Sequence, residues 1–499
     1  MDIAGTIGHR EVLTSSTLLA RMVKKGLSPA QARQRMSRGA EDGKRIWRSQ
    51  NLALPHNERL FARREFVGSP QFFNAVGAHL ESARPGLARC LEAATKRPVL
   101  LEYEVAKLSA SLLNAPATAR VPTIQREMAA LTEVGFRHDA PGTSLSRVVQ
   151  ETSTHAATIG PTHKAAAKRA AETQITRILG EHYRRHNLIS WNSLNVADSQ
   201  AGVLPFNDVP FCGYAYSWAR PMVMFRTGRD PCPTPVMFDV YARHCFEEDV
   251  SGFKNRLERA RRARKLAFPL LAVIGAYDFA PSAFEFAKKE GMLVVNLRDF
   301  FGNDALDALA AMEAVLVHVD AGTPISSGTG DKDLAEKLAR LHSHPLIVDI
   351  KGVALESTAA LTAKADGWED VRLGVDVPFD QTTRDVDVLG MRYGETEFRA
   401  IECKAHRKDI EVPGSEVKKF FTETVPSLVK ARSTRGTRPD IRAEFWTTGI
   451  IGSDAKRAFG ECKMGKHIDA RLWGLEDVLK AIPKNLKRSR ALVQAISEV

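Results

Sequence analysis

The chain has 499 residues, of which 44% are hydrophobic, 26% charged and 7% aromatic, a balance typical of folded globular proteins. This balance excludes a wholly disordered chain, and the apolar runs are shorter than the roughly 20 residues of a membrane-spanning helix. The six cysteines form no CxxC pair, so we expect neither a zinc ribbon nor a disulfide framework. We therefore expect a cytoplasmic protein of about three domains with no membrane partner. The net charge of +12 favours a polyanionic partner.

The first predicted domain covers residues 1–140. A helix over Thr14–Lys25 ends at Gly26, and Ser28 and Pro29 are suited to begin a second, arginine-rich helix. Two short extended pieces follow. This order resembles a winged helix-turn-helix, and residues 98–139 suggest a second, less clear copy. The alternative is a small helical domain with a solvated, arginine-rich face.

The second helix of this domain carries the first candidate DNA-binding residues. They are spaced i, i+3, i+4 and i+7, so they share one helix face, and they are Gln31, Gln34, Arg35 and Arg38. Amide and guanidinium groups are the side chains that read base edges and phosphates in a major groove. We expect Ala30, Ala32 and Met36 to pack inward.

The second predicted domain covers residues 160–322 and has an α/β pattern. A linker is expected over residues 141–162, a long helix over Thr162–His186, and alternating strands and helices from about residue 235. The strongly basic helix Lys254–Lys265 includes Arg261 and Arg262, which we take as further DNA-binding candidates, against the alternative of a helix patterned for solubility. Residues 323–333 are expected to form a second linker.

The third predicted domain, residues 340–499, contains the most informative segment, RDVDVLGMRYGETEFRAIECKA. We predict a hairpin that places Asp387 on one strand and Glu402 and Lys404 on the next, with the turn near Arg392. Because alternate residues of a strand face the same side, Glu402 and Lys404 project together. Two carboxylates on adjacent strands are suited to a hard divalent cation, and Glu356 lies on the preceding helix. The alternative is a surface hairpin with a cross-strand salt bridge.

These residues resemble the motif of the PD-(D/E)xK nuclease superfamily, which has the restriction-endonuclease-like fold. The matching positions are Asp387, Glu402 and Lys404, with Glu356 upstream and a helix–strand–helix order downstream, over about residues 345–485. The resemblance implies an α/β/α domain in which Asp387 and Glu402 bind Mg²⁺ or Mn²⁺ and Lys404 assists the attacking water. The proline of the family motif is absent here, which leaves Asp385 as a rival metal ligand.

The middle domain contains a second stretch that aligns with this motif. PVMFDVYARH aligns with EFRAIECKAH, so that Asp239 takes the place of Glu402 and Tyr241 that of Lys404. We expect either a degenerate copy of the same fold, without metal catalysis because tyrosine supplies no cation, or an unrelated Rossmann-like layer.

The fold class expected from the sequence is therefore multidomain α+β and α/β. The expected function is that of a Mg²⁺-dependent DNA endonuclease, in bacterial restriction or antiviral defence by analogy of architecture. DNA is the expected partner, with a homodimer or a regulatory protein as further partners. The alternatives are a DNA-binding regulator or scaffold with a degenerate nuclease-like domain, and an RNA nuclease. A helix that reads a major groove argues against RNA.

Overall fold

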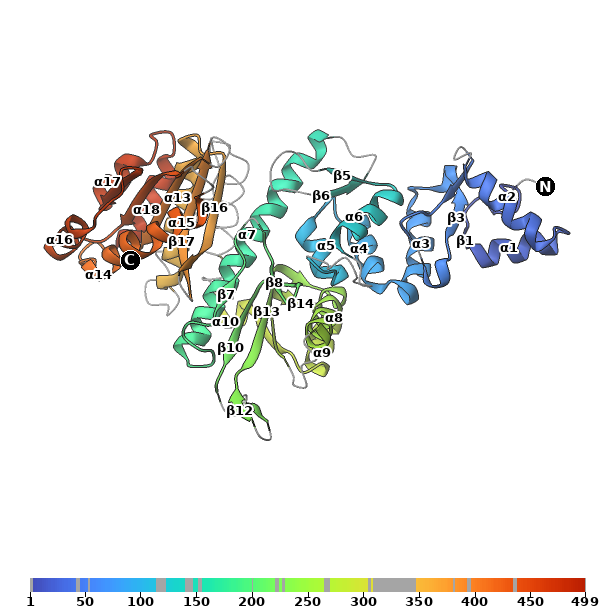
Figure 1. Ribbon diagram of the computed structural model, residues 1–499, viewed down its shortest axis with the longest axis horizontal. Helices are drawn as coiled ribbons and strands as arrows, with labels where there is room; N and C mark the ends of the chain where they lie inside the picture. The colour runs from blue at the N-terminus through green and yellow to red at the C-terminus, as the bar shows by residue number, and fades with distance from the viewer. Residues whose placement is uncertain are drawn as a thin grey trace. The chain divides into compact units, whose positions relative to one another are not determined.

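The computed structural model describes residues 3–41, 45–52, 54–113, 123–139, 147–150, 155–199, 201–219, 224–226, 229–263, 270–303, 307, 347–379, 382–392, 396–433 and 438–498. It is a mixed α/β structure of two compact units (Figure 1). The first unit contains residues 1–165, 205–210 and 247–266, and the second contains the remainder. This division differs from the three consecutive domains expected from the sequence. The predicted linker at 323–333 lies outside the described residues.

The first unit opens with a strand–helix–helix–hairpin arrangement. Its elements are β1 (Val12–Thr14), α1 (Ser15–Lys24), α2 (Pro29–Glu41), β2 (Ile46–Arg48) and β3 (Leu60–Arg63), with short 3₁₀ turns at Pro55–Asn57 and Arg64–Phe66. The three strands form an antiparallel sheet in the order β1-β3-β2. This confirms the helices and the two extended pieces expected from the sequence.

The same arrangement occurs a second time in this unit. After α3 (Pro70–Ala83) and α4 (Pro85–Lys96) come β4 (Val99–Leu101), α5 (Glu102–Ser109), α6 (Ile124–Glu133), β5 (Phe136–Asp139) and β6 (Arg147–Gln150). Their sheet order, β4-β6-β5, repeats the antiparallel pairing of β1-β3-β2. The repeat suggested for residues 98–139 is therefore present in the topology, and it extends past residue 140 because β6 is its central strand.

The first two helices begin where side chains cap them. Thr14 accepts a hydrogen bond from the backbone N–H of Thr17, and Ser28 accepts one from that of Gln31 while the Gln31 amide oxygen accepts the N–H of Ser28. This reciprocal pair is a capping box and satisfies two donors at the start of α2. On α2, Ala32 and Met36 are buried as expected. Ala30 is exposed, because it lies in the first turn, outside the packed face.

The basic helix α8 (Glu247–Ala263) belongs to the first unit. It packs closely on α5, and a Cβ at Gly252 would lie 2.8 Å from the carbonyl oxygen of Lys107. Arg256 is buried and donates to the carbonyl of Pro210 at 2.9 Å. The ribbon of β8 (Leu204–Phe206) and β9 (Val209–Phe211) turns at Asn207 and Asp208, whose positive φ angles suit a tight hairpin.

The second unit contains two five-stranded sheets. The middle sheet is built from β7 (Asn195–Val196), β10 (Gly213–Ser217), β13 (Thr234–Cys245), β14 (Leu271–Phe279) and β15 (Leu293–Asn296). Its helices are α7 (His155–Arg185), α9 (Pro281–Lys289) and α10 (Leu297–Phe301), and β11 (Met224–Arg226) and β12 (Arg229–Cys232) form a separate ribbon.

The C-terminal sheet contains β16 (Asp370–Phe379), β17 (Thr382–Arg392), β18 (Glu397–Lys404), β19 (Asp440–Thr447) and β20 (Ile468–Trp473). Around it lie α13 (Ile347–Ala365), α14 (Gly414–Lys419), a π turn at Phe420–Thr424, α15 (Val425–Arg432), α16 (Ser453–Glu461), α17 (Leu475–Ala481) and α18 (Lys487–Glu498). The sequence predicted the helix before this sheet, the hairpin of β17 and β18, and the helix–strand–helix order after it, but missed both β16 and α18.

The two sheets have the same topology. In each, three antiparallel strands in chain order are followed by two parallel ones, β7-β10-β13-β14-β15 and β16-β17-β18-β19-β20. Each is preceded by a long helix, α7 or α13, and each parallel connection passes through a helix. The middle sheet is therefore mixed, with three antiparallel strands, whereas the sheet of a Rossmann layer is mostly parallel.

Apolar side chains from both sheets and both long helices form one core. It contains Ile175 and Leu179 of α7, Phe238 of β13, Val353 of α13 and Trp446 of β19. The opposite face of the C-terminal sheet packs separately against α14 to α16, so this sheet is covered on both faces. The shared core holds α7 and α13 in fixed positions within one unit.

Residues 141–162 do not form the continuous linker expected from their composition. Strand β6 lies within this segment and α7 begins at His155, before the predicted start at Thr162. The hydroxyl of Thr162, which is buried, accepts a hydrogen bond from Arg147 at 2.7 Å. Tertiary packing therefore overrides the low helix propensity of this stretch. None of the helices in the described parts of the chain has the length and apolar character of a membrane-spanning segment.

A buried ion pair links β18 and β19. Arg399 and Glu444 are both inaccessible to solvent, and their side chains lie 2.9 Å apart. The Trp446 indole also donates to Glu444, at 2.8 Å. We predict that Glu444→Ala lowers the free energy of unfolding by about 3 kcal/mol, because the buried Arg399 loses this partner and keeps the carboxylate of Asp366, at 2.7 Å. Urea denaturation measures the change.

The matched control is Glu476→Ala, which removes an exposed carboxylate 3.9 Å from Lys480. A pair of this kind contributes about 0–1 kcal/mol. Equal effects of the two substitutions would contradict the assigned role of the Arg399–Glu444 pair.

Candidate functional site

The carboxylates predicted from the sequence lie together beside the C-terminal sheet. The register that pairs Val388 with Ile401 brings Asp387 opposite Glu402, so their side chains project from the same face. Glu356 of α13 is 7% exposed and Asp387 is 8% exposed. Together with Asp385, which lies two residues before Asp387 on β17, these residues form what we call the acidic cluster: Glu356, Asp385, Asp387 and Glu402.

The hairpin holds two of these carboxylates in defined positions. The backbone N–H of Cys403 donates to Oδ2 of Asp387 at 2.7 Å. Lys404 Nζ donates to Oε1 of Glu402 at 2.6 Å. Lys404 thus pairs with a carboxylate of its own strand, in surroundings that are largely buried, rather than across an exposed hairpin.

Burial and mutual repulsion make these carboxylates hard to ionise. Burial raises the pKa of Glu356 to about 8, with a further rise from Asp387 and an opposing effect from Arg177. Burial likewise raises the pKa of Glu402 to about 7, and Asp387 adds to the rise against the effect of Lys404. For Lys404, burial favours the neutral form, but the carboxylates of Glu402 and Asp387 outweigh it and raise its pKa. The lysine therefore stays charged. Perturbed pKa values of this kind are typical of functional sites.

Arg177 is a member of this site that the sequence analysis missed. It belongs to α7, and its Nη1 lies 2.9 Å from Oδ2 of Asp385. Asp385, the rival metal ligand, is therefore engaged with a cation in the structure. The sequence contained no signal for this contact, because nothing in the spacing of α7 relates it to strands some 200 positions later.

The donor set of the acidic cluster fits a hard divalent cation. All of its donors are carboxylate oxygens, as Mg²⁺ and Mn²⁺ prefer. Oε2 of Glu356 and Oδ1 of Asp385 are buried without a hydrogen-bond partner, which leaves acceptor capacity in the site. In the arrangement shown, no three His, Cys, Asp or Glu side chains of the described residues converge as a complete metal site.

The middle sheet carries a different set of residues at the corresponding positions. The register that pairs Gly213 with Phe238 brings Cys212 opposite Asp239, as Asp387 lies opposite Glu402. Asp239 accepts hydrogen bonds from Tyr241 at 2.6 Å and from Cys212 at 3.2 Å, and it is inaccessible to solvent. Glu172 of α7 accepts the backbone N–H of Ala242. Here two neutral groups hold the one carboxylate of the strand pair.

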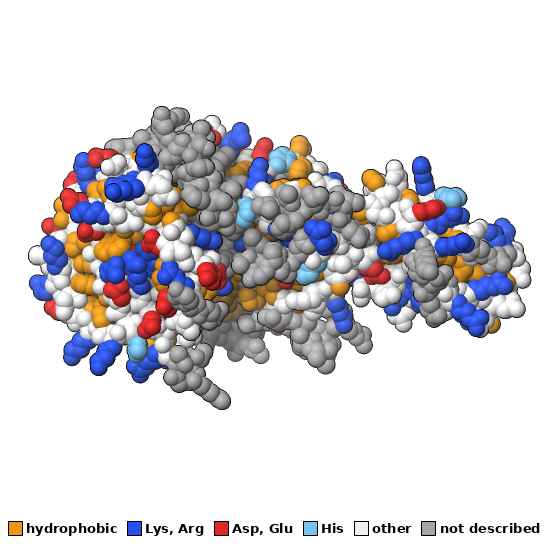
Figure 2. Space-filling model, turned by 90° about the horizontal axis from the view of Figure 1, so that it is seen from above, with side chains coloured by type: hydrophobic (Ala, Val, Ile, Leu, Met, Phe, Trp, Pro, Cys, Tyr) orange, Lys and Arg blue, Asp and Glu red, His pale blue; other side chains and the backbone are white. Residues whose placement is uncertain are grey.

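The candidate DNA-binding residues lie on helix surfaces of the first unit. The side chains of Gln31, Gln34, Arg35 and Arg38 on α2 and of Arg261 and Arg262 on α8 are exposed. Arg262 lies 3.4 Å from Glu258, one turn earlier on α8. Figure 2 shows Lys and Arg side chains over the N-terminal part of the surface, on the right. The Gln31 amide oxygen is engaged in the capping box, so its NH₂ group is left to face a ligand.

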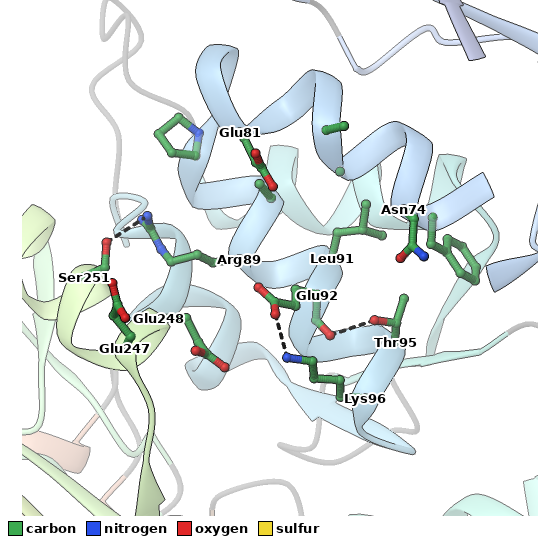
Figure 3. Close-up of a pocket in the computed structure, with 15 residues that line it drawn as sticks. Asn74, Glu81, Arg89, Leu91, Glu92, Thr95, Lys96, Glu247, Glu248 and Ser251 are labelled. Carbon is green, nitrogen blue, oxygen red and sulfur yellow. Dashed lines mark hydrogen bonds and ion pairs between the residues drawn. The ribbon is translucent and has the colours of Figure 1, made fainter. Parts of the chain in front are cut away.

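A separate hollow in the first unit lies between α3, α4 and the start of α8 (Figure 3). Its two basic side chains have partners within the lining: Lys96 lies 2.5 Å from the carboxylate of Glu92, and Arg89 donates to the hydroxyl of Ser251 at 3.3 Å. Glu81, Glu247 and Glu248 add further negative charge. This lining does not suit a polyanion, and it contains none of the predicted site residues.

Comparison of the chain with models of known protein families, with curated proteins and with solved structures finds no match.

The raised pKa of Glu356 predicts how stability depends on pH. Between the ordinary value of about 4.5 and about 8, the folded state holds a proton that the unfolded state has released, so stability falls as pH rises through this window. Glu356→Gln replaces the protonated acid by a neutral isostere. We predict that, without divalent cations, its melting temperature matches the wild type near pH 5 and exceeds it by a few degrees near pH 8.5.

Thermal unfolding at the two pH values in EDTA measures this difference. Glu285→Gln on α9 is the control, because its side chain is exposed. If Glu356→Gln and the wild type have the same melting temperature at both pH values, the surroundings of Glu356 do not disfavour its ionised form.

Proposed function

We propose that the chain is a metal-dependent DNA endonuclease of the PD-(D/E)xK superfamily. The observation that carries the proposal is the register of β17 and β18, which brings Asp387 opposite Glu402 with Lys404 on the same strand face. Glu356 approaches from α13, and its pKa is sensitive to both Asp387 and Lys404. The three antiparallel strands followed by two parallel ones, covered by helices on both faces, support the restriction-endonuclease-like fold.

The proposed reaction is hydrolysis of a phosphodiester bond. The oxygen of water bonds to phosphorus, and the bond from phosphorus to one ester oxygen breaks. Asp387 and Glu402 would hold Mg²⁺ or Mn²⁺, which supplies Lewis-acid activation of the phosphate when bound. Lys404 orients the attacking water and offsets charge on the pentacovalent phosphorus, because it stays protonated in this site. Glu356, on α13, is the fourth member of the set.

The first unit supplies the proposed DNA-binding surface. Two strand–helix–helix–hairpin repeats support a tandem pair of winged helix-turn-helix modules. One face of α2 is exposed and carries amide and guanidinium groups, and the opposite face is buried. Such a helix suits the major groove, and the net charge of +12 favours a nucleic acid. A cytoplasmic role in restriction or antiviral defence, as a homodimer or with a regulatory protein, fits this pairing of parts.

A DNA-binding regulator with a degenerate nuclease-like domain is the second candidate. Two observations favour it. Lys404 and Glu402 form an ion pair with each other, and no three side chains of the described residues converge as a set of metal ligands. A cleavage assay separates the two candidates. Purified protein is incubated with plasmid, linear and single-stranded DNA, with and without Mg²⁺ or Mn²⁺.

Lys404→Ala and Glu402→Ala each test the proposed chemistry. We predict that each lowers the cleavage rate at saturating DNA by about 10²–10³ while DNA binding remains nearly unchanged. The matched control is Asp239→Asn, at the position of the middle sheet that corresponds to Glu402, which we expect to leave cleavage intact. Full activity of Lys404→Ala, or loss of activity in a folded Asp239→Asn protein, would show that the active site has been placed wrongly.

Arg35→Ala combined with Arg38→Ala tests the DNA-binding surface. Each phosphate contact removed is expected to reduce the slope of log affinity against log salt concentration by about 0.9. We predict weaker binding, a shallower salt dependence and slower cleavage at limiting DNA, but normal cleavage at saturating DNA. Fluorescence anisotropy at 50 and 200 mM salt measures the binding. Unchanged affinity at both concentrations would show that α2 is a solvated surface helix and does not contact DNA.

A further inference from the structure

Arg177 reaches the acidic cluster from a helix that precedes the other sheet. Its neighbours Ile175, Ile178 and Leu179 are buried in the core that the two sheets share, so α7 is anchored on either side of the arginine. The guanidinium group lies 2.9 Å from Asp385 on β17, and 18% of the Arg177 side chain is exposed. The side chain is therefore held by an ion pair and is partly exposed.

The C-terminal sheet has a notch that accommodates this guanidinium group. Gly374, in the middle of β16, has a φ of +63°, and a Cβ built on it would overlap Nη2 of Arg177. Glycine adopts this backbone conformation without the steric penalty of other residues. The absence of a side chain at this position of β16 thus leaves the space that the guanidinium group of Arg177 occupies.

We propose that Arg177 is a phosphate-binding residue of the nuclease site, supplied by the helix of the middle sheet. The proposal rests on the nuclease function proposed above. A guanidinium group presents donors in a planar fork that matches a phosphate, and it carries a fixed charge. Lys404 and Arg177 are each paired with one carboxylate, Glu402 and Asp385 respectively, so the site presents two cations of different geometry.

Arg177 adds a second positive charge to the acidic site. The carboxylates of Asp385, Glu356 and Asp387 favour its charged form, as does that of Asp376 on β16. A second cation beside the cluster lowers the repulsion between these carboxylates and an incoming phosphate. Asp385 is then a positioning residue that holds Arg177, while Asp387 and Glu402 serve as the ligand pair.

The test compares Arg177→Ala with Arg184→Ala. Arg184 is two turns further along the same helix and stacks on the exposed Trp191 ring at 4.7 Å, so it is the matched control. Two quantities are measured on the full chain: the affinity for a short DNA duplex with Ca²⁺ in place of Mg²⁺, and the single-turnover cleavage rate with Mg²⁺. We expect Arg177→Ala to weaken duplex binding about tenfold or more and to slow cleavage by about 10²–10³. Arg184→Ala should change neither.

Gly374→Ala is a second variant that displaces the guanidinium group without removing its charge. It should slow cleavage in the wild type but have little further effect on cleavage in the Arg177→Ala background, because the group it displaces is already gone. Thermal unfolding of each variant shows whether a loss of cleavage is explained by a loss of stability. Additive effects of the two substitutions would overturn the assigned contact.

The possible outcomes separate this proposal from the function on which it rests. If the wild type cleaves DNA and Arg177→Ala binds and cleaves DNA normally, the role of Arg177 is overturned and the proposed nuclease function is kept. Absence of wild-type cleavage, with weaker duplex binding by Arg177→Ala, overturns the nuclease and keeps the phosphate contact. Absence of cleavage with unchanged binding overturns both.

Discussion

Four carboxylates confined beside one sheet repel one another, and the second unit is organised around offsetting that repulsion. The register of β17 and β18 and the position of α13 bring the acidic side chains together. Two cations offset them from different directions, Lys404 from the same hairpin and Arg177 from α7. Because α7 precedes the other sheet, the electrostatics of the C-terminal sheet depend on the core that joins the two. Burial raises the pKa values of Glu356 and Glu402, and repulsion from Asp387 adds to the rise.

The two sheets have the same topology but differ in the number of carboxylates at equivalent strand positions. At the positions of Asp387, Glu402 and Lys404, the middle sheet has Cys212, Asp239 and Tyr241. There a single carboxylate, Asp239, accepts hydrogen bonds from a thiol and a phenol. The strand order is the same in both sheets, so equivalent strand positions hold an acidic pair beside a lysine in one sheet and one carboxylate with two neutral donors in the other.

The sequence predicted the parts of the structure that depend on local pattern. Alternation along β18 placed Glu402 and Lys404 on one face, and capping residues marked the start of α2. Strand β16 was not predicted, although Val371, Leu373, Val375 and Val377 alternate along it and are buried, which is the local pattern of a strand. The start of α7 was missed because buried contacts, and not helix propensity, order it. Arg177 was out of reach for the same reason: its role arises from packing between distant segments.

The path of the chain has a consequence for how the protein is made. The chain passes from one compact unit to the other at residues 165, 204, 210, 246 and 266, so neither unit is a continuous stretch. During synthesis, the first unit cannot be completed until residues 247–266 have left the ribosome, by which time β7, β10 and β13 of the middle sheet are already present. Three strands of this sheet therefore emerge before the first unit is complete, and its last two strands, β14 and β15, emerge afterwards. Dissection by truncation would cut across cooperative structure, and a nick in the connections at these residues would disturb both units at once.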